Sequence, residues 1–212
     1  MSEKRISHCQ GKGNLTHNNR KFNAKNVDDT RTKDNIVFVQ QPIDEAYERL
    51  FGPAVERYNA KQKRADRKIK TSYFRHIFKR DISQSVVTAA DKRKSFYEDV
   101  VQIGDMKNTG VGTPDAEIAT ACLTEYMQGF QQRNPNFYVF NAVLHLDEAT
   151  PHLHIDYILF SSIKIVTPSL KRSSQAFLPR GKSIIKRMRS DGIIPEQNII
   201  LNVGEQFVLA AV

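Results

Sequence analysis

Along the chain, segments in which apolar residues have the spacing of strands are interspersed with segments in which they have the spacing of helices. Five short segments carry the dense or alternating apolar residues typical of strands: 5–9, 34–41, 96–103, 137–146 and 152–160. The last two are separated only by "DEATP" (147–151), and this short connection predicts a hairpin. The pattern therefore predicts about five strands.

Two longer segments have the three- and four-residue spacing of amphipathic helices. The first follows Pro42 and carries an apolar stripe from Ile43 to Tyr58, which Gly52-Pro53 should kink or break. The second begins at Thr113-Pro114, a helix cap followed by proline at the first helical position. Its expected buried stripe repeats every fourth residue (Ile118, Cys122, Tyr126 and Phe130), and "RNP" at 133–135 should end it.

Three of the six histidines lie within "HLDEATPHLH", residues 145–154. Side chains alternate faces along a strand, so the odd-numbered residues from Leu153 to Leu159 should face a helix-covered core. His152 and His154 should share the other face with Asp156, and a hairpin would place His145 opposite them. The alternative is a polar sheet face that has simply accumulated histidines. Three neutral imidazoles could hold Zn, Mn, Fe, Ni or Cu and leave coordination positions open for catalysis.

The composition suits a soluble protein of one large or two small domains. The 212 residues include two cysteines, Cys9 and Cys122, which is no disulfide framework and favours a reducing cytoplasm. The N-terminus lacks the apolar core of a signal peptide, and no apolar run reaches the roughly 18 residues needed to span a bilayer. We therefore expect a cytoplasmic protein with no membrane-spanning segment.

The positive charge is concentrated in one segment. Residues 57–80 hold ten Lys or Arg and one acid, a surplus of nine that equals the formal net charge of +9 for the whole chain. Aromatic residues lie among these cations, as suits a polyanion whose bases can stack. The candidate DNA-binding residues are Lys61, Lys63, Arg64, Arg67 and Lys68. A second basic stretch, 164–189, carries eight cations and no acid. The alternative in both cases is a solvated helix face.

A metal site combined with basic segments makes a phosphodiester the leading substrate. A bound divalent ion could act as a Lewis acid on a phosphate oxygen. The residues also permit a metallohydrolase in which Glu148 serves as general base.

Several motifs together resemble the MobV, or plasmid recombination enzyme (Mob/Pre), relaxases of the HUH endonuclease superfamily. These are "GKGNLTHNNRKF" (11–22), "YNAKQKRADRKI" (58–69) and "FQQRNPNFYVFNAVLHLDEATPHLHIDYI" (130–158), with His152-Leu153-His154 as the signature of the superfamily. The resemblance covers about residues 7–160. It implies an α+β fold with a central antiparallel sheet of about five strands flanked by helices, in agreement with the strand count.

The resemblance also implies an activity and residue roles. The activity is nicking of one strand at a plasmid transfer origin, with transient linkage to the 5′ end and later rejoining. His17 would be the nucleophile, and Arg20 would contact the scissile phosphate or stabilise its developing charge. Glu148 would orient or deprotonate the nucleophile. The metal, Mn²⁺ or Mg²⁺, would be held by His145, His152 and His154, with Asp147 supporting these ligands. Asp156 is our own addition, either as an acceptor for a metal-bound imidazole or as a solvated strand residue.

The motifs divide the chain into an expected catalytic domain, 1–163, and a divergent tail, 164–212, that is basic and then apolar. Relatives continue for a long helical region where this chain stops, which leaves the oligomeric state open. The expected partner is origin DNA, as a single strand or a hairpin. The alternative functions are a rolling-circle replication initiator, a phosphoester metallohydrolase and an inactive DNA-binding remnant.

Overall fold

The computed structural model describes residues 5–22, 24–79, 94–160, 198–203 and 206–211. The chain divides into two units, Met1–Ile158 and Leu159–Val212. In the second unit, the described residues form the antiparallel strands β6 (Asn198–Val203) and β7 (Gln206–Ala211). The second basic stretch, 164–189, and most of the expected tail lie outside the described residues.

The first unit is built on one five-stranded sheet with the order β1-β3-β5-β4-β2. Its strands are β1 (Ile6–Gln10), β2 (Ile36–Gln40), β3 (Tyr97–Ile103), β4 (Phe137–His145) and β5 (His152–Leu159). The pairs β1–β3, β3–β5 and β2–β4 are antiparallel. β4 and β5 are adjacent in the sheet and in the chain, as in a hairpin. The expected α+β fold with a central antiparallel sheet of five strands is confirmed.

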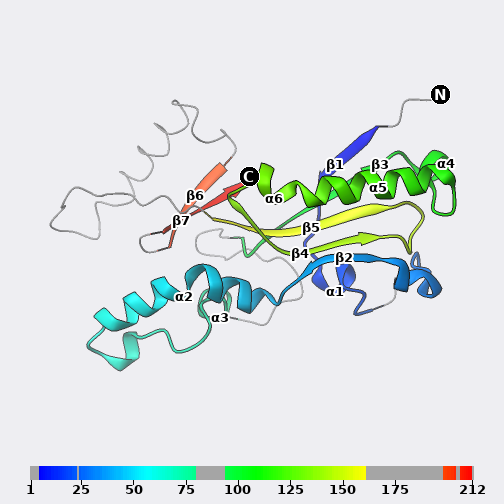
Figure 1. Ribbon diagram of the computed structural model, residues 1–212. Coiled ribbons are helices and arrows are strands. Elements are labelled where there is room, and N and C mark those ends of the chain that lie inside the picture. The colour runs from blue at the N-terminus through cyan, green and yellow to red at the C-terminus, as the bar shows by residue number, and fades with distance from the viewer. Residues whose placement is uncertain (1–4, 23, 80–93, 161–197, 204–205, 212) are drawn as a thin grey trace. The chain divides into compact units, whose positions relative to one another are not determined.

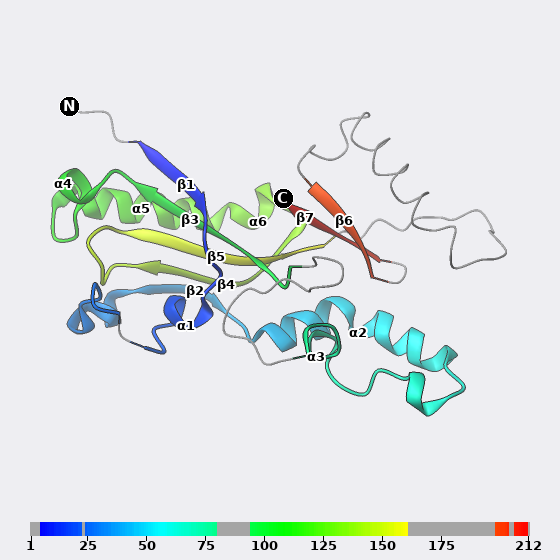
Figure 2. The ribbon, with the colours of Figure 1, turned by 180° about the vertical axis from the view of Figure 1, so that it is seen from behind.

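Helices lie on both faces of this sheet. On one face are α5 (Pro114–Gln128) and α6 (Phe130–Arg133), and on the other are α1 (Leu15–Asn18) and α2 (Ile43–Lys61) (Figures 1 and 2). The remaining helical segments are η1 (Asp29–Asp34), η2 (Ala65–Arg67), α3 (Tyr73–Phe78) and α4 (Met106–Thr109). With helices on both faces, every residue of β5 is buried. None of the helices in the described residues is long and apolar enough to cross a membrane.

Of the kink or break expected at Gly52-Pro53, the break is wrong, because α2 continues through Pro53 to Lys61. A proline inside a helix removes one backbone hydrogen bond and crowds the residue four positions earlier. Here that residue, Arg49, is exposed, as is Pro53 itself, so water can satisfy the released carbonyl. Aromatic packing of Tyr47 and Phe51 against α3 holds the helix in place, with ring centroids of Tyr47 and Phe74 5.0 Å apart.

The expected stripe on α5 is also wrong in its details. Thr113 caps the helix through its side chain and Pro114 is its first residue, as expected. However, Ile118 and Cys122 are exposed, and the buried residues are instead Ala116, Ala119, Leu123 and Met127. A strict four-residue step rotates by about 40° each time around a helix of 3.6 residues per turn, so it leaves the buried face. The helix ends at Gln128, and α6 is a separate turn that ends before Asn134.

Candidate active site

Four imidazoles gather on the sheet face that α1 covers. His145 ends β4, His152 and His154 begin β5, and His17 lies on α1. The ring centroids of the three strand histidines are 4.6–5.2 Å apart, and that of His17 is 5.7 Å from both His145 and His154. The hairpin therefore brings together the three histidines that the sequence placed on one face, and α1 adds a fourth.

One nitrogen of each strand histidine is bonded to a fixed oxygen. His145 Nε2 is 2.9 Å from the Asn18 carbonyl, His152 Nδ1 is 2.8 Å from the Thr150 carbonyl, and His154 Nδ1 is 2.6 Å from Glu98 Oε1. A carbonyl and a carboxylate only accept hydrogen bonds, so each of these nitrogens carries the proton. The lone pairs therefore lie on His145 Nδ1, His152 Nε2 and His154 Nε2.

These lone pairs suit a metal ion. Among the described residues, His145 Nδ1 and His154 Nε2 are buried and have no hydrogen-bond partner. Buried polar atoms in proteins are almost always paired, so two orphaned nitrogens in one cluster fit a bound cation. Within the described part of the chain, two sets of three side chains have ligand atoms within 4.8 Å of one another: His17, His145 and His154, and His145, Glu148 and His152.

The protonation states also fit a metal. Burial lowers the pKa of His145 to about 2, and burial likewise lowers the pKa of His152. Both rings are therefore neutral at pH 7, as metal binding requires.

Glu148 lies close to three of the four imidazoles. Its Oε1 is 3.5 Å from His17 Nε2 and 3.8 Å from both His145 Nδ1 and His152 Nε2. Its Oε2 accepts a 2.6 Å hydrogen bond from Asn26, a residue that the sequence did not single out. This carboxylate can therefore stabilise positive charge on His17 or serve as a further metal ligand.

Arg20 is held by two carboxylates. Its guanidinium bonds both oxygens of Asp147, at 2.8 and 2.6 Å, and Glu148 Oε1 at 2.7 Å, and its side chain is only 7% exposed. Its backbone is left-handed, with φ of 47°, a conformation that non-glycine residues rarely adopt outside functional or tightly held positions. If Arg20 contacts the scissile phosphate, as expected from the sequence, it would do so while bonded to Asp147 and Glu148.

Asp147 is buried and accepts hydrogen bonds from three different residues of the site. Besides Arg20, its Oδ2 accepts hydrogen bonds from Thr32 at 3.0 Å and Asn35 at 2.7 Å, which tie η1 and the start of β2 to the hairpin loop. Burial opposes ionisation, but these hydrogen bonds, led by that from Arg20, leave the pKa of Asp147 well below its usual value.

His17 is the accessible imidazole of the group. Its side chain is 24% exposed, and its Nε2 is 3.4 Å from Arg20 Nη1. Burial and the positive charge of Arg20 lower its pKa, which favours the neutral ring at pH 7. A neutral, partly exposed imidazole beside a metal-type cluster is suited to nucleophilic attack.

The sequence of this chain is similar to that of one protein family over most of its length. Residues 1–186 match the sequence model of Mob_Pre, described as the plasmid recombination enzyme. The chain belongs to this family. The resemblance carried by the motifs is thereby confirmed, and the protein is an enzyme of plasmid recombination.

Solved structures of Mob_Pre relaxase domains are similar to this chain. Two are the MobM relaxase domain (MOBV; Mob_Pre) bound to plasmid pMV158 oriT DNA of 22 nucleotides, with Mn, at pH 5.5, and the same domain with a 3′-thiophosphate at pH 6.8. They are 22% and 20% identical to this chain, with TM-scores of 0.41 and 0.40, and the match covers 88% of this chain and 86% of each of theirs. No curated protein matches this chain.

In this Mob_Pre protein the hydrogen bond from His154 goes to Glu98 and not to Asp156. The Asp156 carboxylate accepts hydrogen bonds from Asn18 at 2.9 Å and Asn141 at 2.8 Å, whereas Glu98 accepts the one from His154. Asp156 is also fully buried, so the solvated alternative is wrong as well. Burial, and then the charge of Glu98, raise the pKa of Asp156 to about 8. The sequence signal for Glu98 was a pair of acids, Glu98 and Asp99, within the strand "YEDVVQI".

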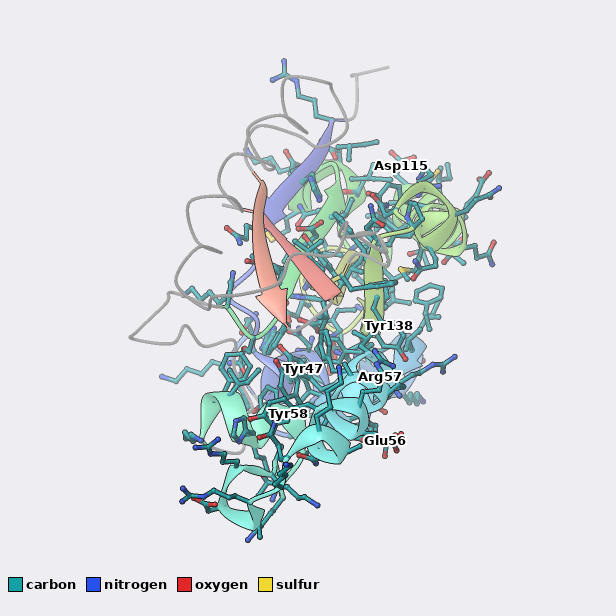
Figure 3. All side chains as sticks on the ribbon, turned by 90° about the vertical axis from the view of Figure 1, so that its left-hand side faces the viewer. Tyr47, Glu56, Arg57, Tyr58, Asp115 and Tyr138 are labelled. Carbon is teal, nitrogen blue, oxygen red and sulfur yellow. The ribbon has the colours of Figure 1, made fainter. Side chains whose placement is uncertain are left out.

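The five candidate DNA-binding cations are all exposed. Lys61 ends α2, and Lys63, Arg64, Arg67 and Lys68 follow in and around η2. Tyr58, expected on the apolar stripe, is 44% exposed among them, whereas Tyr47 is buried. Figure 3 shows Tyr47 on the side of α2 towards the sheet and Glu56 on the opposite side. Cations and an aromatic ring therefore share an open surface at the end of α2.

Proposed function

We propose that this protein is a metal-dependent relaxase that nicks one DNA strand at a plasmid transfer origin and forms a covalent 5′-phosphoryl link to His17. The observation that carries the proposal is the set of fixed imidazoles with unpartnered lone pairs beside the partly exposed His17. Family membership supports plasmid DNA as the substrate. Such an enzyme would act in the cytoplasm, where plasmids reside.

His145, His152 and His154 would hold the divalent ion, Mn²⁺ or Mg²⁺. When bound, the ion supplies Lewis-acid stabilisation of charge on phosphate oxygens. The similar MobM domain structures contain Mn and oriT DNA.

The chain's own residues perform the transfer. With its proton on Nδ1, neutral His17 attacks phosphorus through Nε2, so that a P–N bond forms and the bond to the 3′ oxygen breaks. The electron pair leaves with the 3′ oxygen, which takes up a proton from solvent, while the imidazole keeps its proton on Nδ1. Glu148, 3.5 Å from Nε2, stabilises the positive charge that develops on the imidazole. Attack by a 3′ hydroxyl on the P–N link reverses these steps and rejoins the strand.

The end of α2 and η2 would bind the DNA backbone. Lys61, Lys63, Arg64, Arg67 and Lys68 offer exposed positive charge, and phosphate contacts of this kind position a protein without reading the base sequence. Exposed Tyr58 offers a surface for base stacking.

A covalent adduct tests the proposal. The protein is incubated with Mn²⁺ and candidate origin DNA, and the linked peptide is mapped. We expect the adduct on His17, labile to acid and comparatively stable to alkali, as for a phosphoramidate. The variant His17→Ala should form none, whereas His8→Ala, which changes an exposed histidine on β1, should match the parent. An adduct on a tyrosine would refute the role of His17. Cleavage without an adduct would favour a hydrolase.

A further inference from the structure

Two buried residues, Asn18 and Glu98, connect the helix that carries His17 to the strands that carry the other histidines. Asn18 is 1% exposed and follows His17 directly, and Glu98 is 3% exposed on β3. The sequence motifs assigned a role to neither residue. Both are polar groups removed from water, which costs free energy unless every contact is well made.

Glu98 joins His154 to the loop that precedes α1. Its Oε1 accepts the 2.6 Å hydrogen bond from His154 Nδ1, and its Oε2 accepts a 2.5 Å hydrogen bond from the Gly13 backbone. The glycines of "GKG" permit this close approach, since a Cβ on Gly11 would overlap the Glu98 carboxylate and Gly13 has φ of 68°.

Asn18 joins the same carboxylate to α1. Its side-chain Nδ2 donates to Glu98 Oε1 at 2.7 Å and to Asp156 Oδ2 at 2.9 Å. Its backbone carbonyl accepts a hydrogen bond from His145 Nε2 at 2.9 Å. One residue adjacent to His17 therefore contacts strands β3, β4 and β5. Because α1 is only four residues long, these contacts set where His17 lies relative to the other histidines.

We propose that Glu98 and Asn18 are positioning residues: Glu98 fixes the tautomer and orientation of His154 for metal binding, and Asn18 fixes the distance from His17 to that site. This inference rests on the proposed relaxase function and adds two residues to its machinery. The placement of Glu98 supports it. Glu98 lies directly opposite Asp156 in the β3–β5 register, so two carboxyl groups are buried side by side, and removing such polar groups from water costs free energy. A carboxylate at such a position serves the site rather than the fold.

The first test removes the charge of Glu98 and keeps its shape. In Glu98→Gln, Mn²⁺ affinity measured without DNA should fall by about 10- to 100-fold, as for other acceptors of metal-bound histidines. The ¹⁵N chemical shifts of the His154 ring should report loss of the single Nδ1–H tautomer. The matched control is Asp99→Asn on the same strand, because Asp99 bonds His8 and Tyr157 away from the imidazole cluster. Folded Glu98→Gln with the affinity and tautomer of the parent would overturn the role of Glu98.

The second test separates positioning from metal binding and does not depend on Glu98→Gln folding. In Asn18→Ala the backbone carbonyl still accepts from His145 and Glu98 still accepts from His154, so Mn²⁺ affinity should stay close to that of the parent. The rate of adduct formation at saturating Mn²⁺ and DNA should fall at least about tenfold, since misplacing a reacting group by about 1 Å costs on the order of 100-fold. A parent-like rate would overturn the role of Asn18. Failure of the parent itself to bind Mn²⁺ or form an adduct would contradict the proposed function instead.

Discussion

At each strand histidine, one ring nitrogen donates to a fixed oxygen and the other keeps its lone pair. Three different oxygens do this: the carbonyls of Asn18 and Thr150 and the carboxylate of Glu98. A hydrogen bond of this kind fixes the tautomer and prevents rotation of the ring. The cluster is therefore preorganised for a cation before any cation arrives, which lowers the entropic cost of binding.

Removing two of these rings should remove the metal site. The variant His152→Ala/His154→Ala should lose stoichiometric Mn²⁺ binding and adduct formation, because one imidazole cannot replace three ligands. Binding is measured by isothermal titration calorimetry, and His76→Ala, at an exposed position of α3, is the control. Because burial lowers the pKa of His145 and His152, the parent should retain Mn²⁺ binding at pH 6, where exposed imidazoles are largely protonated. Unchanged binding in the double variant would contradict the metal site.

Protonation of Asp156 explains how the side chains of Glu98 and Asp156 can be buried together next to the strand histidines. Glu98 accepts three hydrogen bonds which, despite its burial, lower its pKa, whereas burial and the charge of Glu98 raise the pKa of Asp156 to about 8. The folded protein thus holds a proton on Asp156 between about pH 4 and 8 that the unfolded chain has released. The contribution of Asp156 to stability is therefore greatest below pH 4 and falls as the pH rises towards 8.

Replacing Asp156 with asparagine should remove this dependence. Asp156→Asn mimics the protonated acid, so its unfolding free energy without metal should exceed that of the parent at pH 7, by a difference that grows from pH 4 to pH 8. Chemical denaturation at several pH values measures it. Mn²⁺ affinity should change little, because Glu98 is the acceptor for His154. A stability difference that is constant over this range would show that Asp156 is ionised in the folded protein.

At the scale of elements, α2 serves two purposes along its length. Its first half buries Ile43, Ala46, Tyr47 and Phe51, and its second half is mostly exposed and leads into the cations of η2. Packing of Tyr47 and Phe51 on α3 anchors the helix and leaves its far end open to a large ligand. The local charge surplus is thus placed where a polyanion can reach it.

Neutralising this end of α2 should change the salt dependence of DNA binding. Each phosphate contact contributes about −0.7 to the log–log salt slope on single strands and about −0.9 on duplex. Replacing Lys61, Lys63, Arg64 and Arg67 with Gln should therefore flatten the slope by roughly 3 to 4 units if all four contact phosphates. The cleavage rate at saturating DNA and low salt should stay within a few-fold of the parent.

The matched control for this test exchanges Lys for Arg and Arg for Lys at the same four positions. Charge is conserved, so the slope should stay near that of the parent. An identical slope in the parent and the Gln variant would show that this surface is an ordinary solvated helix end.

At the scale of the whole molecule, the candidate site belongs to one unit. His17, Arg20, Glu98 and the hairpin histidines all lie within Met1–Ile158. The family match extends further, to residue 186. We propose that residues 1–163 form the catalytic domain and that 164–212 form a separate tail.

A fragment of residues 1–163 should therefore fold and bind Mn²⁺ with an affinity close to that of the full chain. Mn²⁺ should raise its melting temperature, because a ligand that binds only the folded state stabilises it. The control is the same fragment with His152→Ala/His154→Ala, whose melting temperature should not respond to Mn²⁺. A folded fragment that fails to bind Mn²⁺ would place an essential part of the site beyond residue 163.

The local pattern was enough to predict the five strands of the large sheet, the α5 cap and the gathering of three histidines, but not β6 and β7. Each depends on residues close together in the chain: alternation along a strand, a short hairpin connection, and a threonine beside a proline. His17, Arg20, Asp147 and Glu148 came from recognisable motifs, and the structure brings all four to the imidazole cluster.

Tertiary structure alone decided which groups hold these histidines. Glu98 contacts His154 because β3 lies beside β5, although the two residues are 56 positions apart in the sequence. Asn18 contacts His145 because α1 packs against the hairpin, although these two residues are 127 positions apart. The same packing buried Asp156, turned Ile118 towards solvent and kept α2 continuous past Pro53. Periodicity shows which residues share a face of one element, but what covers that face depends on how distant elements pack.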